Sequence, residues 1–219
     1  MSGLLSSSIA RKFAMSLSAL FLISFLTLHV AVNLLSVCSP EAYNTASHFM
    51  GTNPLIQFAM QPILIVGVVF HFVLGFVLEL KNRKAQGVRY VKNNGAANSS
   101  WMSRNMILSG AVILLFILVH FIDFWIPEMN YKYIQGLPEA PSRYYPELVE
   151  KFHNPIKVGV YVVAFIFLAL HLLHGFNSAF QSIGLNNKYT KGFKKIATAF
   201  SIVVPAAFIF IALFHHFNH

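Results

Sequence analysis

Residues 55–80 have the sequence LIQFAMQPILIVGVVFHFVLGFVLEL, in which His71 and Glu79 are the only ionisable side chains. A helix needs about 20 mostly apolar residues to cross the hydrocarbon core of a bilayer, so this run predicts a membrane-spanning helix. Four more runs of this kind predict an all-α integral membrane protein, a bundle of five transmembrane helices in one domain (residues 1–219). The other predicted spans are residues 13–37, 104–126, 155–180 and 196–217.

The composition supports this fold class and excludes a soluble enzyme. Hydrophobic residues make up 56% of the 219 residues and charged residues 11%, whereas a soluble domain has about 25% charged residues. The single cysteine, Cys38, excludes an internal disulfide and a cysteine-based metal cluster. The net charge of +9 comes from basic residues between the apolar runs, which is typical of membrane loops and predicts no nucleic-acid partner.

Lysine and arginine are distributed unevenly between the two ends of the predicted bundle. One end, formed by the N-terminal segment and two loops, holds 12 basic residues and one acid, Glu79. The opposite end holds 4 basic residues and 6 acids. Because cytoplasmic loops carry the excess of lysine and arginine, the N-terminus is predicted to be cytoplasmic and the C-terminus outside.

The outer connections and the prolines predict further features. Residues 39–53 predict a short interfacial helix, and residues 127–154 predict an outer cap. A proline does least harm at a helix end, so Pro127 predicts the end of the third span. Pro62 and Pro205 fall inside spans and predict kinks.

Four histidines lie at matched depths in four predicted spans. His29, His71, His120 and His171 each lie 16 residues from the start of a span, and these spans alternate in direction. At 1.5 Å per residue they form two layers roughly 10–15 Å apart, His29 with His120 toward the outside and His71 with His171 toward the inside. Ionisable residues inside a membrane are costly and are therefore functional candidates. Two imidazoles at one depth suit bis-histidine ligation of a haem iron, so we predict two b haems.

Small residues beside the histidines predict room for porphyrin rings. The pattern H-x-x-x-G occurs twice, at residues 71–75 and 171–175, and places each glycine on the same helix face as its histidine. Residues 109–110, Ser-Gly, lie on the third span below His120 and are expected to leave room for the second ring. The glycines expected to pack against haem are Gly67, Gly75, Gly110 and Gly175.

Less specific interpretations remain open for these residues. A single membrane histidine is more often a hydrogen-bonded packing residue than a metal ligand. His174, one turn from His171, is an alternative ligand or a hydrogen-bond partner of a haem propionate. Glu79 and Asp123 are expected at span ends, so no buried carboxylate relay of a proton-coupled transporter is predicted. The histidines expected to be ordinary solvated side chains are His48, His153, His215, His216 and His219.

Several segments, taken in order and spacing, resemble a known family. They are residues 28–33 (LHVAVN), 42–50 (AYNTASHFM), 70–75 (FHFVLG), 109–110 (SG, followed ten residues on by a histidine) and 171–176 (HLLHGF). Together they resemble the single-subunit, five-helix, dihaem cytochrome b anchor of succinate:quinone oxidoreductases, the b558 type shared with quinol:fumarate reductases. The resemblance covers nearly the whole membrane region.

The resemblance implies cofactors and partners. His71 and His171 would hold the proximal haem b, and His29 and His120 the distal haem b. A flavoprotein subunit and an iron–sulfur subunit would dock on the cytoplasmic side. The basic loops at residues 81–104 and 181–195 are expected to contact the iron–sulfur subunit or anionic lipid headgroups.

Two positions depart from the family pattern. Some dihaem members carry a glutamate for compensating proton movement where this chain has Ala169, and some carry a glutamate at the quinone site where it has Asn44. We expect the quinone to bind near the outer layer, where polar side chains follow the first span. The expected species is menaquinone. The candidates for this site are Asn44, Ser47, His48, Gln57 and Gln61.

These observations predict a multi-pass subunit of respiratory complex II in a bacterial inner membrane, linked to the tricarboxylic acid cycle. Its haems would carry electrons between a cytoplasmic succinate or fumarate module and membrane quinone, with no succinate chemistry in this chain. One alternative is the dihaem cytochrome b anchor of a hydrogenase or formate dehydrogenase. Another is a haem-free transporter.

Overall fold

The computed structural model describes residues 7–85, 105–184 and 190–218, and its long elements there are helices. Five helices are long and apolar enough to cross a membrane, as predicted, and each is longer than the predicted run. They are Ser8–Cys38, Ile56–Lys84, Met106–Ile134, Pro155–Ser182 and Thr190–Phe217.

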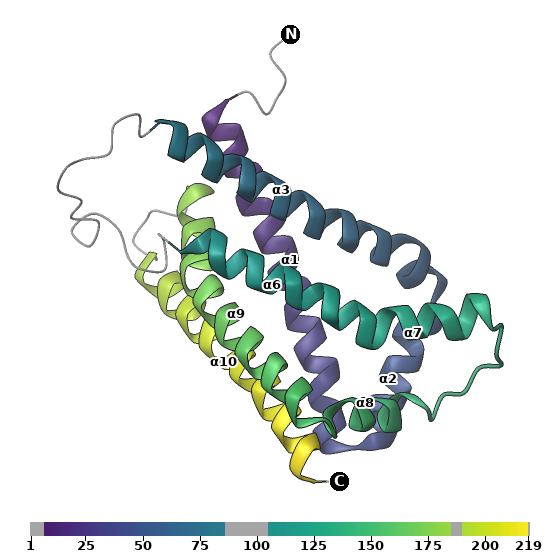
Figure 1. Cartoon of the computed structure of the whole chain (residues 1–219). Helices are drawn as coiled ribbons and strands as arrows, with labels where there is room; N and C mark the ends of the chain where they lie inside the picture. Colours follow the sequence, from purple (N-terminus) through teal and green to yellow (C-terminus); the bar gives the residue numbers. More distant parts are fainter. Residues whose placement is uncertain (1–6, 86–104, 185–189, 219) are drawn as a thin grey trace.

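Successive long helices run in opposite directions along one bundle (Figure 1). The first three are α1 (Ser8–Cys38), α3 (Gln61–Ala85) and α6 (Met106–His120), and the last two are α9 (Pro155–Ser182) and α10 (Thr190–Phe217). α9 and α10 pack side by side along their length, and α1 contacts both of them as well as α3. The described N-terminal end of α1 and the C-terminal end of α10 therefore lie at opposite ends of the bundle.

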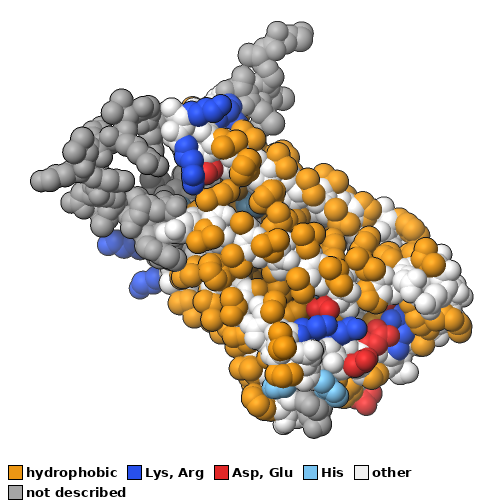
Figure 2. Space-filling model, in the orientation of Figure 1, with side chains coloured by type: hydrophobic (Ala, Val, Ile, Leu, Met, Phe, Trp, Pro, Cys, Tyr) orange, Lys and Arg blue, Asp and Glu red, His pale blue; other side chains and the backbone are white. Residues whose placement is uncertain are grey.

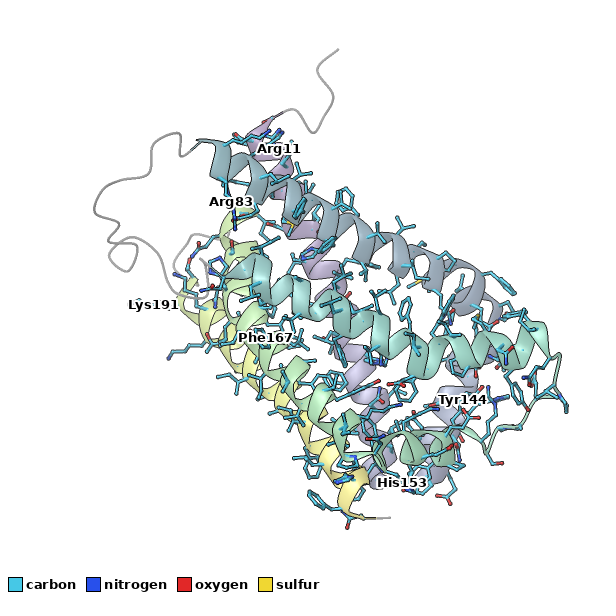
Figure 3. All side chains as sticks on the ribbon, in the orientation of Figure 1. Arg11, Arg83, Tyr144, His153, Phe167 and Lys191 are labelled. Atoms are coloured by element: carbon cyan, nitrogen blue, oxygen red, sulfur yellow. The ribbon has the colours of Figure 1, made fainter. Side chains whose placement is uncertain are left out.

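The two ends of the bundle differ in charge. Arg11, Arg83 and Lys191 lie at one end, which we call the basic end, and Tyr144 and His153 lie at the other, the cap end (Figure 3). Hydrophobic side chains cover the visible side between them, while acidic, basic and histidine side chains mix at the cap end (Figure 2). The predicted basic loops span residues 81–104 and 181–195. Of these, residues 86–104 and 185–189 lie outside the described residues.

Local sequence accounts for where the helices begin. The Ser7 hydroxyl caps α1 by accepting a hydrogen bond from the backbone N–H of Ile9. α2 (Pro40–Thr52), which confirms the predicted short helix after the first span, begins with a proline at N1 behind a capping serine, Ser39. The side chain of Asn154 caps α9 by accepting from two backbone N–H groups.

The third span ends later than predicted. Pro127 lies inside a continuous helix that runs to Ile134, so the predicted end at residue 126 is wrong. Two π-helical turns, Phe121–Trp125 and Asn130–Ile134, flank the proline, and a widened turn can absorb the hydrogen bond that a proline cannot donate. The helix ends just before Gly136, whose φ of 59° is a conformation that favours glycine.

The cap end is held together by a cluster around Arg143. Its guanidinium forms ion pairs with Glu128 and Glu147 and lies over two aromatic rings, 4.1 Å from the centroid of Tyr131 and 4.4 Å from that of Tyr144. Burial alone would lower the pKa of Arg143, but its hydrogen bonds and charge pairing with the two glutamates hold that pKa above its ordinary value. Burial and the nearby Glu128 carboxylate raise the pKa of Tyr144 to about 12. The predicted outer cap therefore contains the end of the third span and a further helix, α8 (Tyr144–Phe152).

Candidate functional site

The first pair of histidines joins α3 to α9 near the basic end. The ring centroids of His71 and His171 are 6.4 Å apart, with an interplanar angle of 68°. The Ser18 hydroxyl oxygen, on α1, lies 2.9 Å from Nδ1 of His71, and the Ser109 hydroxyl oxygen, on α6, lies 3.1 Å from Nδ1 of His171. Four helices thus meet at this inner pair.

The second pair joins α1 to the end of α6. The ring centroids of His29 and His120 are 5.7 Å apart, with an interplanar angle of 85°. Their surroundings are largely aromatic, with Phe25 and Phe208 beside His29 and Phe116, Phe124 and Tyr161 beside His120. Both rings are partly buried among these side chains.

Both pairs have the spacing that one shared metal ion requires. A bond from an imidazole nitrogen to a transition metal is about 2 Å long, and that nitrogen lies about 1 Å from its ring centroid, so two such rings on opposite sides of one ion have centroids roughly 6 Å apart. The observed 6.4 Å and 5.7 Å bracket this value. The centroid separation of each pair is therefore compatible with two histidines that share one haem iron.

The outer pair also has an unsatisfied nitrogen. Nδ1 of His120 is buried without a hydrogen-bond partner among the described residues. A buried polar atom with no partner costs about 1–3 kcal/mol, so such atoms point to a missing ligand or ion. An imidazole nitrogen is a common ligand of iron, and this donor chemistry fits a haem at the same place.

The two pairs are separated along the bundle. Ser18, which contacts the inner pair, and His29 of the outer pair lie on the same helix, α1, eleven residues apart. At 1.5 Å per residue this places the layers about 16 Å apart, slightly more than predicted. The fold brings together the same rings that the sequence analysis placed at one depth, His71 with His171 and His29 with His120.

Asp123 forms a buried ion pair that the sequence analysis missed. Its carboxylate lies 2.5 Å from Nζ of Lys157 and accepts a hydrogen bond from the hydroxyl of Tyr161 at 2.9 Å. Asp123 is only 8% exposed. The prediction that it lies at a span end is wrong, because the third helix continues past it to Ile134. Since Asp123 follows His120 by one turn, a charged cluster lies directly beyond the outer pair.

The four predicted glycines have different neighbours. A Cβ added at Gly67 would lie 2.7 Å from the Phe21 ring of α1, so this glycine permits close helix packing. A Cβ at Gly110 would lie 3.6 Å from His171, so Gly110 and Ser109 border the inner pair, and the prediction that they make room below His120 is wrong. The reason is that Ser109 and Gly110 lie near the start of α6, at the depth of the inner pair. Gly75 and Gly175 face methionine side chains, Met15 and Met106.

The remaining histidines of the spans and of the cap end have different surroundings. His174 is partly buried near the inner pair, but the ring that faces His71 is that of His171. His215 is one of the most deeply buried side chains, with its Nε2 atom 2.8 Å from the Ser36 hydroxyl, so the prediction of a solvated side chain is wrong for it. This burial arises because the last turns of α10 pack against α1. His153 is exposed, as predicted, Nδ1 of His216 lies 2.8 Å from a backbone carbonyl, and His219 lies outside the described residues.

The five quinone candidates divide between two places at the cap end. On α2, the Asn44 side chain accepts a hydrogen bond from the backbone N–H of Tyr145, and Nε2 of His48 lies 3.4 Å from a carboxylate oxygen of Glu139. Ser47 lies on α2 between Asn44 and His48, one turn after Tyr43.

The two glutamines face the third span instead. Gln57 accepts a hydrogen bond from the hydroxyl of Tyr133 at 2.5 Å, and Gln61 accepts one from the indole N–H of Trp125 at 3.5 Å. Trp125 follows His120 by five residues on the same continuous helix. Gln61 therefore contacts the third span about 8 Å along the helix from His120, whereas Tyr133, the partner of Gln57, follows His120 by thirteen residues.

Comparison with known proteins gives one distant relative. The chain is 22% identical over 197 residues to the succinate dehydrogenase cytochrome b558 subunit of Bacillus subtilis (strain 168), a match that covers 86% of this chain and 85% of that protein. No family model matches the chain. No solved structure matches it either.

Proposed function

We propose that this chain is the membrane cytochrome b subunit of a succinate:quinone oxidoreductase, in a bacterial inner membrane. The proposal depends on one observation: two histidine pairs lie on helices that are long and apolar enough to cross a membrane. The centroid separation of each pair is that of two rings bound to one iron. The distant relative supports it, because that protein is named as a succinate dehydrogenase cytochrome b558 subunit and the match extends over most of both chains.

In this proposal the inner pair, His71 and His171, holds one haem b, and the outer pair, His29 and His120, holds the second. When bound, each haem supplies reversible one-electron chemistry at its iron. The chain would supply the histidine nitrogens that hold each iron, would keep the two centres about 16 Å apart along the helices, and would line the outer centre with aromatic side chains.

The basic end would face the cytoplasm, where a flavoprotein subunit and an iron–sulfur subunit dock. The support is the excess of lysine and arginine at that end, which the positive-inside rule associates with the cytoplasm. Succinate chemistry would belong to those partners, with this chain linking them to the membrane. The inner pair lies nearer the basic end and would therefore be the first centre to exchange electrons with the iron–sulfur subunit.

The quinone would bind at the cap end, next to the outer pair. Gln57 and Gln61 support this position, because their side chains and the facing Tyr133 and Trp125 offer hydrogen-bonding groups and aromatic surface in one place. Menaquinone is the species we expect. His48, on α2 at the same end of the bundle, is a further candidate for this site.

Gentle solubilisation and affinity purification of the chain from its native membrane test the proposal. We expect flavin and iron–sulfur proteins to copurify, and succinate to reduce the cytochrome b absorption bands of the complex. Copurification of hydrogenase or formate dehydrogenase subunits instead would assign the chain to another respiratory complex. A purified chain without haem absorption would favour the transporter.

A further inference from the structure

The inner pair has a hydrogen-bonded support that the described residues do not provide for the outer pair. The Ser18 hydroxyl donates to the backbone carbonyl of Met15 at 2.9 Å, and the Ser109 hydroxyl donates to the backbone carbonyl of Met106 at 3.0 Å. Each hydroxyl has a single proton, and that proton is already committed to the helix backbone. The serine oxygen can therefore only accept in its contact with the histidine ring.

This constraint fixes the protonation of both rings. A neutral imidazole carries one N–H, and the ring nitrogen next to each serine oxygen is Nδ1, at 2.9 Å in His71 and 3.1 Å in His171. With the hydroxyl proton directed at the backbone carbonyl, the serine oxygen accepts from Nδ1–H, and the lone pair is left on Nε2. Both histidines are thus prepared in the same tautomer before any metal binds.

The support is built twice, by matching residues. α1 and α6 both contain the pattern M-x-x-S, with a histidine eleven residues after the serine, at residues 15–29 and 106–120. Each serine contacts the histidine of an H-x-x-x-G pattern on the neighbouring helix, and each methionine Cε lies against the glycine, 3.3 Å from an added Cβ at Gly75 and 3.7 Å at Gly175. The same set of contacts thus occurs at both rings of the inner pair.

A third serine–histidine contact shows the contrast. The Ser36 hydroxyl donates to the backbone carbonyl of Asn33 at 2.6 Å and lies 2.8 Å from His215, but at Nε2. The same reasoning gives His215 the opposite tautomer. A serine oxygen therefore contacts Nδ1 in both rings of the inner pair, whereas in His215 it contacts Nε2.

We propose that Ser18 and Ser109 are positioning residues that hold His71 and His171 in the Nδ1–H tautomer, so that Nε2 of each ring binds the iron of the inner haem. This inference rests on the proposed function, since it requires a haem between these rings. A hydrogen bond from Nδ1–H increases the basicity of a ligating imidazole and fixes its ring orientation. A more basic ligand favours ferric iron, so both serines lower the midpoint potential of the inner haem.

Threonine and valine substitutions test the proposal, because the two side chains have nearly the same shape and only threonine keeps the hydroxyl. Ser18→Val and Ser109→Val should raise the midpoint potential of one of the two haems and shift its low-spin ferric EPR signal, with the other haem unchanged. Ser18→Thr and Ser109→Thr should behave as wild type. Ser16→Val is the matched control, since the Ser16 hydroxyl donates to its own helix at Lys12 and is buried without a histidine contact.

The outcomes separate this inference from the proposed function. If the wild-type protein and Ser16→Val contain haem, and the threonine and valine variants have the same potentials and EPR signals, the positioning role is wrong while the cytochrome assignment stands. If the valine variants lose one haem and the threonine variants retain it, the role is supported. A wild-type protein without haem would remove the proposed function itself.

Discussion

His71 on α3 and His171 on α9 come from spans that are not consecutive in the chain, and their ring centroids lie 6.4 Å apart. The outer rings meet across another pair of helices, α1 and α6. Each of the helices α1, α3, α6 and α9 thus contributes one histidine ring, and the four rings form two pairs. α10, which has no ring in either pair, packs along α9 and α1.

Replacing His171 should have a larger effect than replacing His174. We expect His171→Ala to abolish the absorption and EPR signals of the inner haem, because its ring is the one facing His71. His174→Ala should shift the potential of that haem and retain its signals. Difference spectra and EPR of purified variants measure both effects. Loss of the inner haem in His174→Ala with retention in His171→Ala would reassign the ligand.

Gly67 should tolerate no side chain. An added Cβ would lie 2.7 Å from the Phe21 ring, so Gly67→Ala forces α1 and α3 apart or displaces the ring, at about 1–3 kcal/mol. Gly159→Ala on α9 is the matched control, because an added Cβ there meets nothing within 4 Å. Thermal unfolding in detergent should show a lower melting temperature for Gly67→Ala alone. Equal melting temperatures would argue against this close packing.

Breaking the ion pair between Asp123 and Lys157 should destabilise the outer half of the bundle. Lys157→Met leaves the buried Asp123 carboxylate without its partner, at a cost of about 3 kcal/mol, and Asp123→Asn should cost less because the Lys157 side chain is 27% exposed. The double variant should recover part of this loss, because no unpaired charge remains. Glu147→Gln, at an exposed ion pair of the cap, should cost less than about 1 kcal/mol. Unfolding of all four variants measures the coupling, and strictly additive losses would contradict it.

Quinone turnover should depend on the glutamines at the start of the second span and on His48. We expect Gln57→Leu and His48→Ala to slow quinone reduction while succinate still reduces both haems through the partner subunits. Thr45→Ala on α2 is the control, because its hydroxyl donates to its own helix at Glu41. Unchanged turnover, together with inhibitor binding next to the inner haem, would contradict an outer site.

The sequence predicted the spans and the two histidine layers well, because both depend on quantities that run along one helix. Apolar length predicts a span, and a constant rise per residue converts position into depth. The partners at each depth follow from alternating directions. The repeated M-x-x-S pattern, whose serine lies eleven residues before His29 and before His120, was also visible in the sequence and would have identified the serines.

The errors concern contacts between helices and the path of the chain near prolines. Asp123 seemed to lie at a span end because Pro127 seemed to stop the helix, whereas π-helical turns carry the helix through it. His215 lies at the end of the last span, and its burial depends on the pairing of α10 with Ser36 of α1. Neither a local backbone adjustment nor a pairing between distant helices follows from hydropathy.

The haem content of the purified chain tests the central claim most directly. Two pairs of histidines, each spaced for one iron, predict about two haems b per polypeptide in a pyridine haemochrome assay, both low-spin with bis-histidine ligation. A ratio near one would show that one of the pairs binds no haem. A ratio near zero in protein purified from its native membrane would contradict the account.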